Sequence, residues 1–233
     1  MAKRKSDEPL VSVVIPAYNE EGNIRRGALE EVLVYLSGEE YGSEVIVVDD
    51  GSADATPVLV EEAAARWPQL RLLRVDHGGK ASAVGAGVAA ARGEHVVFTD
   101  MDQSTPIRYV GDALRELGQG YDVVIGSRFI AGGARLDEPW SRRLLGQGFS
   151  LLVRRLLLPD IRDSQCGFKG FRRQVARKLF EGLLVFTQGG RRPRGPRVTA
   201  FDVELLVQAK NRGYRVKEIP VTWRHAHTSR VDP

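Results

Sequence analysis

Hydrophobic positions in the first half of the chain form short continuous runs separated by longer amphipathic segments. The runs predict strands at Leu10–Ile15, Glu44–Val48, Leu70–Val75, His95–Thr99 and Asp122–Gly126. The segments between them predict helices over about Glu20–Ser37, Thr56–Arg66, Lys80–Arg92 and Ile107–Gly118. Continuous apolar strands that alternate with helices are typical of a mostly parallel sheet with helices on both faces. The predicted fold class is therefore α/β.

The second half is less regular and contains one amphipathic segment. Over Trp140–Leu158, apolar residues recur at helical spacing, with four arginines between them, Arg142, Arg143, Arg154 and Arg155. This pattern is typical of a helix that lies in a membrane interface, and almost equally of one packed on the sheet or in a dimer interface. The Gly-, Pro- and Arg-rich segment Gly189–Arg197 predicts a mobile loop.

Composition is that of an ordinary globular protein. The chain has 233 residues, of which 42% are hydrophobic and 27% charged, enough for one sizeable core, and we expect a single domain over residues 1–233. Its 34 basic and 30 acidic residues are spread along the chain and not blocked, which disfavours nucleic acid as a partner.

Targeting and redox signals are sparse. No stretch approaches about 18 uninterrupted apolar residues, so no membrane span is expected, and the basic N-terminus lacks the apolar run of a signal sequence. Cys166 is the single cysteine, which fits a reducing compartment. We therefore expect a cytoplasmic location.

Polar residues follow the first two predicted strands. After the first come Pro16, Tyr18 and Glu20, where a ring and a carboxylate can face a nucleotide, although a simple strand-to-helix turn explains them as well. Asp49 and Asp50 follow the second strand, and could accept hydrogen bonds from a base or a ribose or form an Asp-Gly turn. Open α/β folds bind ligands at this carboxyl edge of the sheet.

Two acids follow the fourth strand, Asp100 and Asp102. In an extended segment, side chains at i and i+2 point the same way, so both carboxylates could reach one ion. Oxygen ligands of this kind suit Mg²⁺ or Mn²⁺ bridging a diphosphate. The alternative is a pair of solvated loop acids.

Basic residues could supply the matching charge. Lys80 opens a helix after two glycines, Arg128 follows the fifth strand, and Arg224 and Arg230 lie near the C-terminus. Arginine's planar fork matches phosphate oxygens, and a nucleoside diphosphate leaving group needs several such donors. Taken singly, each arginine is better interpreted as a solvated surface charge, and only the combination with the acidic pair favours a phosphate site.

Two later motifs combine polar residues with aromatics, DSQCGFKGF at Asp163–Phe171 and FDVELL at Phe201–Leu206. The glycine within the first motif suggests a loop that packs closely under a substrate. Cys166 has no adjacent histidine, so we interpret it as a small packed residue. His225 and His227 could line an acceptor site.

In this order, the motifs VSVVIPAYNE, VIVVDDGSADAT, GKASAVGAG, FTDMDQS, DVVIGSRF, DSQCGFKGF and FDVELL resemble glycosyltransferase family 2, and within it the dolichyl-phosphate glucose and mannose synthases. The resemblance runs from about Val11 to Arg230. It implies a Rossmann-like GT-A fold, an inverting sugar transfer from a nucleotide sugar, a divalent metal, and a polyprenyl phosphate acceptor. Residues of about 10–130 would bind the donor and those of about 131–233 the acceptor.

The resemblance also implies roles for single residues. Pro16, Tyr18, Glu20 and either Asp49 or Asp50 would hold the nucleoside, and Asp100 and Asp102 would serve the metal and the sugar diphosphate. Met101 and Lys80 complete the donor set. The candidate catalytic residues are Asp102, Arg128 and Asp163. Arg224 and Arg230 keep the spacing of two late basic residues of the family, with Arg230 in place of a lysine.

One departure concerns the metal motif, where many mannose synthases have a glutamine two residues after the second acid. Here Ser104 is at that position and the glutamine is Gln103. The donor is therefore open between UDP-glucose and GDP-mannose. A soluble acceptor and a non-catalytic nucleotide-sugar-binding protein are the alternatives, and the expected partners include a membrane surface and a second copy of the chain or a membrane protein.

Overall fold

A computed structural model describes residues 8–137, 140–183 and 201–224, with only the backbone of 140–147. The strands are β1 (Val11–Ala17), β2 (Ser43–Asp49), β3 (Leu70–Arg74), β4 (His95–Phe98), β5 (Val123–Ser127), β6 (Ala134–Leu136), β7 (Lys169–Arg172), β8 (Val216–Pro220) and β9 (Thr222–Arg224). The helices are α1 (Glu21–Arg25), α2 (Ala28–Ser37), α3 (Thr56–Arg66), α4 (Lys80–Ala90), α5 (Tyr109–Gly118), α6 (Trp140–Leu156), α7 (Arg173–Glu181) and α9 (Phe201–Asn211). Within these residues no helix is long and apolar enough to cross a membrane.

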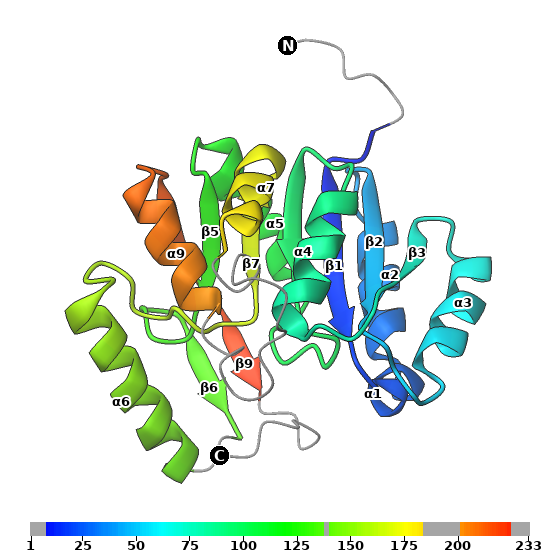
Figure 1. The fold of residues 1–233 in the computed structure, drawn as a ribbon, viewed down its shortest axis with the longest axis horizontal. Helices are drawn as coiled ribbons and strands as arrows, with labels where there is room; N and C mark the ends of the chain where they lie inside the picture. Colours follow the sequence, from blue (N-terminus) through cyan, green and yellow to red (C-terminus); the bar gives the residue numbers. More distant parts are fainter. Residues whose placement is uncertain (1–7, 138–139, 184–200, 225–233) are drawn as a thin grey trace.

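A seven-stranded sheet forms the centre of the molecule, in the order β3-β2-β1-β4-β7-β5-β8 (Figure 1). Its strands run parallel, except that β7 is antiparallel to both of its neighbours, β4 and β5. The short strands β6 and β9 form a separate parallel pair. The prediction of a mostly parallel sheet is confirmed.

Helices cover both faces of the sheet because alternate strand residues point to opposite sides. Val14 of β1 belongs to a core under α4, α7 and α9, whereas its neighbours Val13 and Ile15 belong to a core under α2, α3 and α5. Figure 1 shows α4, α7 and α9 together on the side that faces the viewer. The strands are thus buried from both sides, which explains their continuous apolar runs.

Two details differ from the sequence prediction at the first strand and helix. The predicted helix Glu20–Ser37 is two helices, α1 and α2, because Gly27 adopts φ +88°, a left-handed conformation that ends the first. Strand β1 continues through Pro16, which pairs with β2 opposite Val48. Pairing of β1 with β4 already ends at Val14, so the strand tolerates the absence of a backbone N–H at Pro16.

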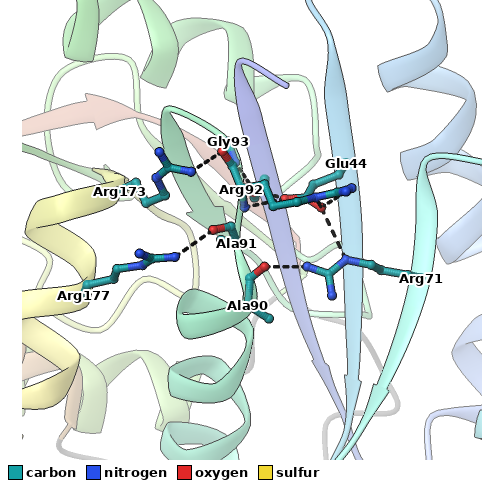
Figure 2. Close-up of polar contacts among 9 residues, drawn as sticks. Glu44, Arg71, Ala90, Ala91, Arg92, Gly93, Arg173 and Arg177 are labelled. Atoms are coloured by element: carbon teal, nitrogen blue, oxygen red, sulfur yellow. Dashed lines mark hydrogen bonds and ion pairs between the residues drawn. The ribbon is translucent and has the colours of Figure 1, made fainter. Parts of the chain in front are cut away.

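A buried carboxylate, Glu44, joins three strands and a loop at the amino edge of the sheet (Figure 2). It accepts hydrogen bonds from the Ser12 hydroxyl at 2.6 Å, from the Arg92 backbone N–H at 2.7 Å, and from the Arg92 and Arg71 side chains at 3.0 and 3.3 Å. Burial alone would raise the pKa of Glu44, but these hydrogen bonds and guanidinium charges hold it below its ordinary value.

We expect Glu44→Gln to destabilise the fold by about 1–3 kcal/mol at pH 7, because the amide cannot accept this set of hydrogen bonds as an anion does. A lowered pKa in the folded state gives stability that is present above the unfolded pKa and is lost as pH falls through the folded one. Urea unfolding should therefore show the two proteins converging below about pH 4. Glu61→Gln on α3, which changes an exposed acid, is the control. A difference in unfolding free energy between Glu44→Gln and the unaltered protein that is the same at every pH would contradict a stabilising role of the Glu44 anion.

Three arginines hold the carboxyl end of α4 beside this carboxylate (Figure 2). Arg71 donates to the Ala90 carbonyl at 2.6 Å, Arg177 donates to the carbonyls of Ala89 and Ala91 at 3.2 Å, and Arg173 donates to the Arg92 carbonyl. Helix ends leave such carbonyls without partners inside the helix, and cations are favourable there. The helix is thus fixed at one end, and its other end begins with Lys80.

Candidate active site

Loops at the carboxyl edge of β1 and β2 are tied together by side-chain hydrogen bonds. The backbone N–H of Asn19 donates to the Ser52 hydroxyl at 2.8 Å, and the Asn19 side chain accepts from the N–H of Ala53 at 2.7 Å. The N–H of Glu20 donates to the Thr56 hydroxyl at 2.7 Å, while the Glu20 carboxylate holds the Asn23 amide. The predicted nucleoside-binding segments therefore form one rigid unit.

An aromatic surface lies on this unit. The ring of Tyr18 is stacked on that of His77, with centroids 4.4 Å apart, and 42% of Tyr18 is exposed. Pro16 lies two residues before Tyr18, inside β1. The exposed ring of Tyr18 is therefore available to a planar ligand such as a base.

Asp49, the last residue of β2, and Asp50, which follows it, are both turned into the protein. Asp50 accepts hydrogen bonds from the N–H groups of Gly78 and Gly79 at 2.7 and 2.9 Å, and His77 Nδ1 lies 2.9 Å from its carbonyl oxygen. Asp49 accepts from the N–H of Ser52 at 3.1 Å and is 1% exposed. Asp50 thus shapes the loop in front of α4.

The two acids after β4 lie at the same edge, but not on an extended segment as predicted. The strand ends at Phe98, and residues 100–103 form a turn in which the N–H of Gln103 donates to the Asp100 carbonyl at 3.2 Å. The turn buries Met101, at 2% exposure, in the core under α5, so only its main chain can face a ligand. Asp100 and Asp102 remain half-buried.

Lys80 meets the first of these acids, with its Nζ 2.5 Å from Asp100 Oδ1. The other oxygen of Asp100 packs against Gly167, where an added Cβ would lie 2.2 Å from it. Burial alone would lower the pKa of the Lys80 ammonium, but the charges of Asp100 and Asp202 hold it above its ordinary value. Asp100, Lys80 and the loop containing Gly167 therefore form one cluster.

The carboxylate of Asp102 has few partners that balance its charge. It accepts a hydrogen bond from the N–H of Ser104 at 2.9 Å. Burial and then the charge of Asp100 raise the pKa of its carboxyl, so its anionic form lacks sufficient counter-charge. Among the residues that the structure describes, no group of three acids, histidines or cysteines surrounds a possible ion. Two carboxylates fit Mg²⁺ or Mn²⁺, which take further oxygens from water and phosphate.

Arg128 is held beside this cluster by a buried acid. Its Nε and Nη2 donate to the two oxygens of Asp163 at 2.6 and 2.8 Å, and its backbone N–H donates at 2.9 Å. Asp163 is 1% exposed. The aromatic rings of Phe129 and Trp223 flank the guanidinium at 5.6 and 5.5 Å. The loop from Asp163 to Gly167 thus connects the arginine with the carboxylate of Asp100.

Comparison with known proteins agrees with this geometry. Residues 12–180 match the family described as Glycosyl transferase family 2. The chain belongs to this family. Glycosyltransferase AglD of Haloferax volcanii is 34% identical over 95% of the chain, and dolichyl-phosphate beta-glucosyltransferase ALG5C of Trichomonas vaginalis is 35% identical over 96%. The chain spans 34% of the first relative's length and 66% of the second's.

Solved glycosyltransferases share the fold at lower identity. The mannosyltransferase PcManGT of Pyrobaculum calidifontis, in complex with GDP-Man and Mn²⁺, is 23% identical over 97% of the chain and 59% of its own, with a TM-score of 0.62. Glucosyl-3-phosphoglycerate synthase of Mycobacterium tuberculosis, in complex with Mn²⁺, UDP and glucosyl-3-phosphoglycerate, is 21% identical over 96% of the chain and 73% of its own, with a TM-score of 0.65. The fold of this family 2 glycosyltransferase is GT-A.

A buried ion pair joins two motifs of the second half of the chain, and the sequence did not predict it. Lys169 of β7 is fully buried and donates to Asp202 of α9 at 2.6 Å and to the Cys166 carbonyl at 2.6 Å. The two motifs that supply these residues were recognised, but no charge pairing between them was predicted. An aspartate in the first turn of an apolar helix was the available signal. The charge of Asp202 also helps to hold the pKa of Lys80 above its ordinary value, so this ion pair lies near Lys80 and Asp100.

The remaining candidates are placed only in part. The N–H of Arg224 in the glycosyltransferase donates to the Ser104 carbonyl at 2.9 Å, which brings β9 to the turn containing Asp102. The Arg224 guanidinium is exposed, 3.6 Å from Asp137. Cys166 is buried, as expected for a packed residue. Arg230, His225, His227 and the segment Gly189–Arg197 lie outside the described residues.

Proposed function

We propose that this glycosyltransferase transfers a hexose, glucose or mannose, from UDP-glucose or GDP-mannose to a polyprenyl or dolichyl phosphate, with inversion and with Mg²⁺ or Mn²⁺. The observation that carries the proposal is the cluster at the carboxyl edge, where Asp100 and Asp102 lie beside Lys80 and the loop that holds Arg128. Acidic cation ligands and basic phosphate ligands in one place suit a metal-bound diphosphate.

Similar proteins support both substrates. ALG5C is named a dolichyl-phosphate beta-glucosyltransferase, a protein of Pyrococcus furiosus at 32% identity is named a dolichol-phosphate mannosyltransferase, and PcManGT was solved with GDP-Man and Mn²⁺. The exposed face of Tyr18 offers a base a stacking surface. Pro16 and Asp49 lie at the ends of β1 and β2, and Glu20 and Asp50 lie in the loops that follow these strands.

Different residues of the chain would then have different roles in a displacement at the anomeric carbon. An oxygen of the acceptor phosphate forms a new bond to the anomeric carbon, while the bond between that carbon and the diphosphate oxygen of the donor breaks. A divalent cation held by Asp100 and Asp102 would supply Lewis-acid stabilisation of the diphosphate. Lys80 and Arg128 add positive charge for phosphate oxygens. A phosphate with second pKa near ~6 is already anionic at neutral pH, so no strong base is required.

Asp163 acts in this scheme through Arg128. Its carboxylate accepts three hydrogen bonds from that arginine. The backbone beside it is held by Glu218, which accepts hydrogen bonds from the N–H groups of Arg162 and Asp163 at 3.0 Å. A carboxylate that is 1% exposed cannot reach a substrate. We therefore assign Asp163 as a positioning residue, which holds the guanidinium of Arg128 in one orientation.

A matrix of donors, metals and acceptors tests the function. UDP-glucose and GDP-mannose are each incubated with Mg²⁺, Mn²⁺ or EDTA, and with either a short polyprenyl phosphate or 3-phosphoglycerate, a soluble phospho-acid. We expect metal-dependent formation of the polyprenyl phosphate sugar from one donor. Transfer to phosphoglycerate alone would show a soluble acceptor instead. If neither donor is transferred or hydrolysed, the proposed glycosyltransferase activity is refuted.

Helix α6 supplies the proposed membrane contact. Four of its apolar residues and its C-terminal neighbour are exposed, by 40–68%: Phe149, Leu151, Leu152, Leu156 and Leu157. Arg154 and Arg155 on the same helix are exposed as well. Figure 1 shows α6 at the outer side of the molecule, next to β6. An apolar face with basic residues fits an interface of anionic lipids, and we place the enzyme at the cytoplasmic face of a membrane.

Binding to anionic liposomes at low salt is the expected result, and salt should weaken it. Changing Leu152 and Leu156 to Ser should reduce co-sedimentation at least about fivefold, since each leucine contributes apolar burial in the bilayer. The matched control changes Val34 and Val58, exposed by 54% and 53% on α2 and α3, to Ser. Equal loss in both double variants, or no binding by the unaltered protein, would contradict the docking role of α6.

A further inference from the structure

The loop before α4 fixes where Lys80 begins. Asp50 accepts hydrogen bonds from the N–H groups of Gly78 and Gly79, and Gly79 adopts φ +85°, a conformation that L side chains rarely adopt. At the other end of α4, arginines of β3 and α7 hold its terminal carbonyls. The helix is therefore anchored at both ends, and Lys80 is presented to Asp100 by a fixed backbone.

One oxygen of Asp100 is already paired with a cation in this arrangement. Oδ1 is 2.5 Å from the Lys80 ammonium. Oδ2 lies against Gly167, where an added Cβ would come within 2.2 Å of it, and 38% of the Asp100 side chain is exposed. The Asp100 carbonyl accepts hydrogen bonds from the main chain and from the side chain of Gln103, which fixes the backbone below the carboxylate. A metal ion that binds Asp100 must therefore compete with the ammonium for this carboxylate.

The charges of the cluster favour a joint arrival of metal and diphosphate. Lys80 and Lys169 face Asp100, Asp102 and Asp202, which leaves one negative charge in total. A divalent cation alone would reverse that sign in a half-buried site. A nucleoside diphosphate that arrives with the cation restores the balance, and its phosphate oxygens give the ammonium a new partner.

From this geometry we infer that Lys80 is an internal cation that competes with the metal for Asp100 and moves to the diphosphate when the donor binds. The inference rests on the proposed function and adds a coupling between two ligands. In the free enzyme Lys80 weakens metal binding, and in the donor complex it contributes to nucleotide binding. Metal and nucleoside diphosphate then bind with positive cooperativity, and each raises the affinity for the other by the same factor.

Mn²⁺ binding measured by electron paramagnetic resonance, with and without UDP or GDP, tests the inference without any turnover. In the unaltered protein we expect the nucleotide to tighten Mn²⁺ binding by about tenfold. In Lys80→Met, Mn²⁺ alone should bind about tenfold more tightly than to the unaltered protein. The factor by which nucleotide tightens Mn²⁺ binding should shrink toward one. Lys80→Met should bind Mn²⁺ more tightly and the nucleotide more weakly, whereas a loss of structure would weaken the binding of both.

Two further variants complete the design. Lys80→Arg keeps the charge and should keep Mn²⁺ binding weak, and Lys178→Met removes an exposed charge of α7 and should leave Mn²⁺ binding unchanged. Mn²⁺ that binds Lys80→Met no more tightly than the unaltered protein would overturn the competition, even in an enzyme that transfers sugar. An unaltered protein that binds neither Mn²⁺ nor nucleotide, and transfers no sugar, would overturn the proposed function as well.

Discussion

Replacement of Asp102 by Ala is expected to lower the rate of sugar transfer by at least about a thousandfold and to leave the fold intact. Metal assistance supplies several kcal/mol of transition-state stabilisation, and about 1.4 kcal/mol corresponds to a factor of ten in rate. Burial and the charge of Asp100 raise the pKa of Asp102, so its anion is not a stabilising group in the free protein. Its loss should therefore shift the thermal midpoint by no more than about 2 °C.

The measurement is initial rate and thermal unfolding on the same samples, with Asp112→Ala as the control. Asp112 lies on α5 in an exposed pair with Arg115 and has no place in the site. Asp102→Asn should behave like Asp102→Ala in rate, because a neutral amide keeps the shape but not the charge that a cation requires. Transfer within tenfold of the unaltered rate in either Asp102 variant would remove this residue from the metal site.

Arg128→Ala is expected to lose both activity and stability. Removal of the guanidinium leaves the carboxylate of Asp163 buried without its main partner, and breaking such a pair costs about 3–5 kcal/mol of unfolding free energy. The transfer rate should fall by at least about a hundredfold, since a charge directed at phosphate oxygens is lost as well. Urea unfolding and transfer kinetics measure the two effects separately.

The double variant Arg128→Ala with Asp163→Asn separates the structural role from the functional one. A neutral amide at position 163 is cheaper to bury without a cation, so the double variant should regain part of the lost stability. It should regain no activity, because nothing replaces the positive charge near the phosphates. Recovery of rate together with stability would mean that Arg128 serves the fold alone and takes no part in transfer.

The first half of the fold could be predicted because its strands are buried on both faces and its helices alternate with them regularly. Strand β7 could not, since Lys169–Arg172 is short and contains two basic residues. Lys169 is tolerated in the middle of the sheet only because Asp202, 33 residues later, and the Cys166 carbonyl accept its hydrogen bonds. Such compensation depends on tertiary contacts that no local pattern reveals.

The same reason limits prediction of the site. Asp100 and Asp102 could be identified from residue type and from their place after a buried strand, and the structure does bring them to the carboxyl edge. Their backbone is a turn, however, and the turn directs Met101 into the core. The partners Lys80 for Asp100 and Asp163 for Arg128 meet through the topology of the sheet, and their spacing in the sequence carries no signal for it.

The antiparallel strand β7 determines the order in which the chain can fold. Among the described strands, β5 is hydrogen-bonded to β7 and β8, and both follow it in the sequence. During synthesis β5 therefore emerges with no neighbour in the sheet, and one edge of β4 remains open until Lys169–Arg172 arrives. Exposed edges template intermolecular pairing, and long-range pairing slows folding. We therefore expect the nascent chain to be aggregation-prone until the segment carrying Lys169 inserts between the two strands.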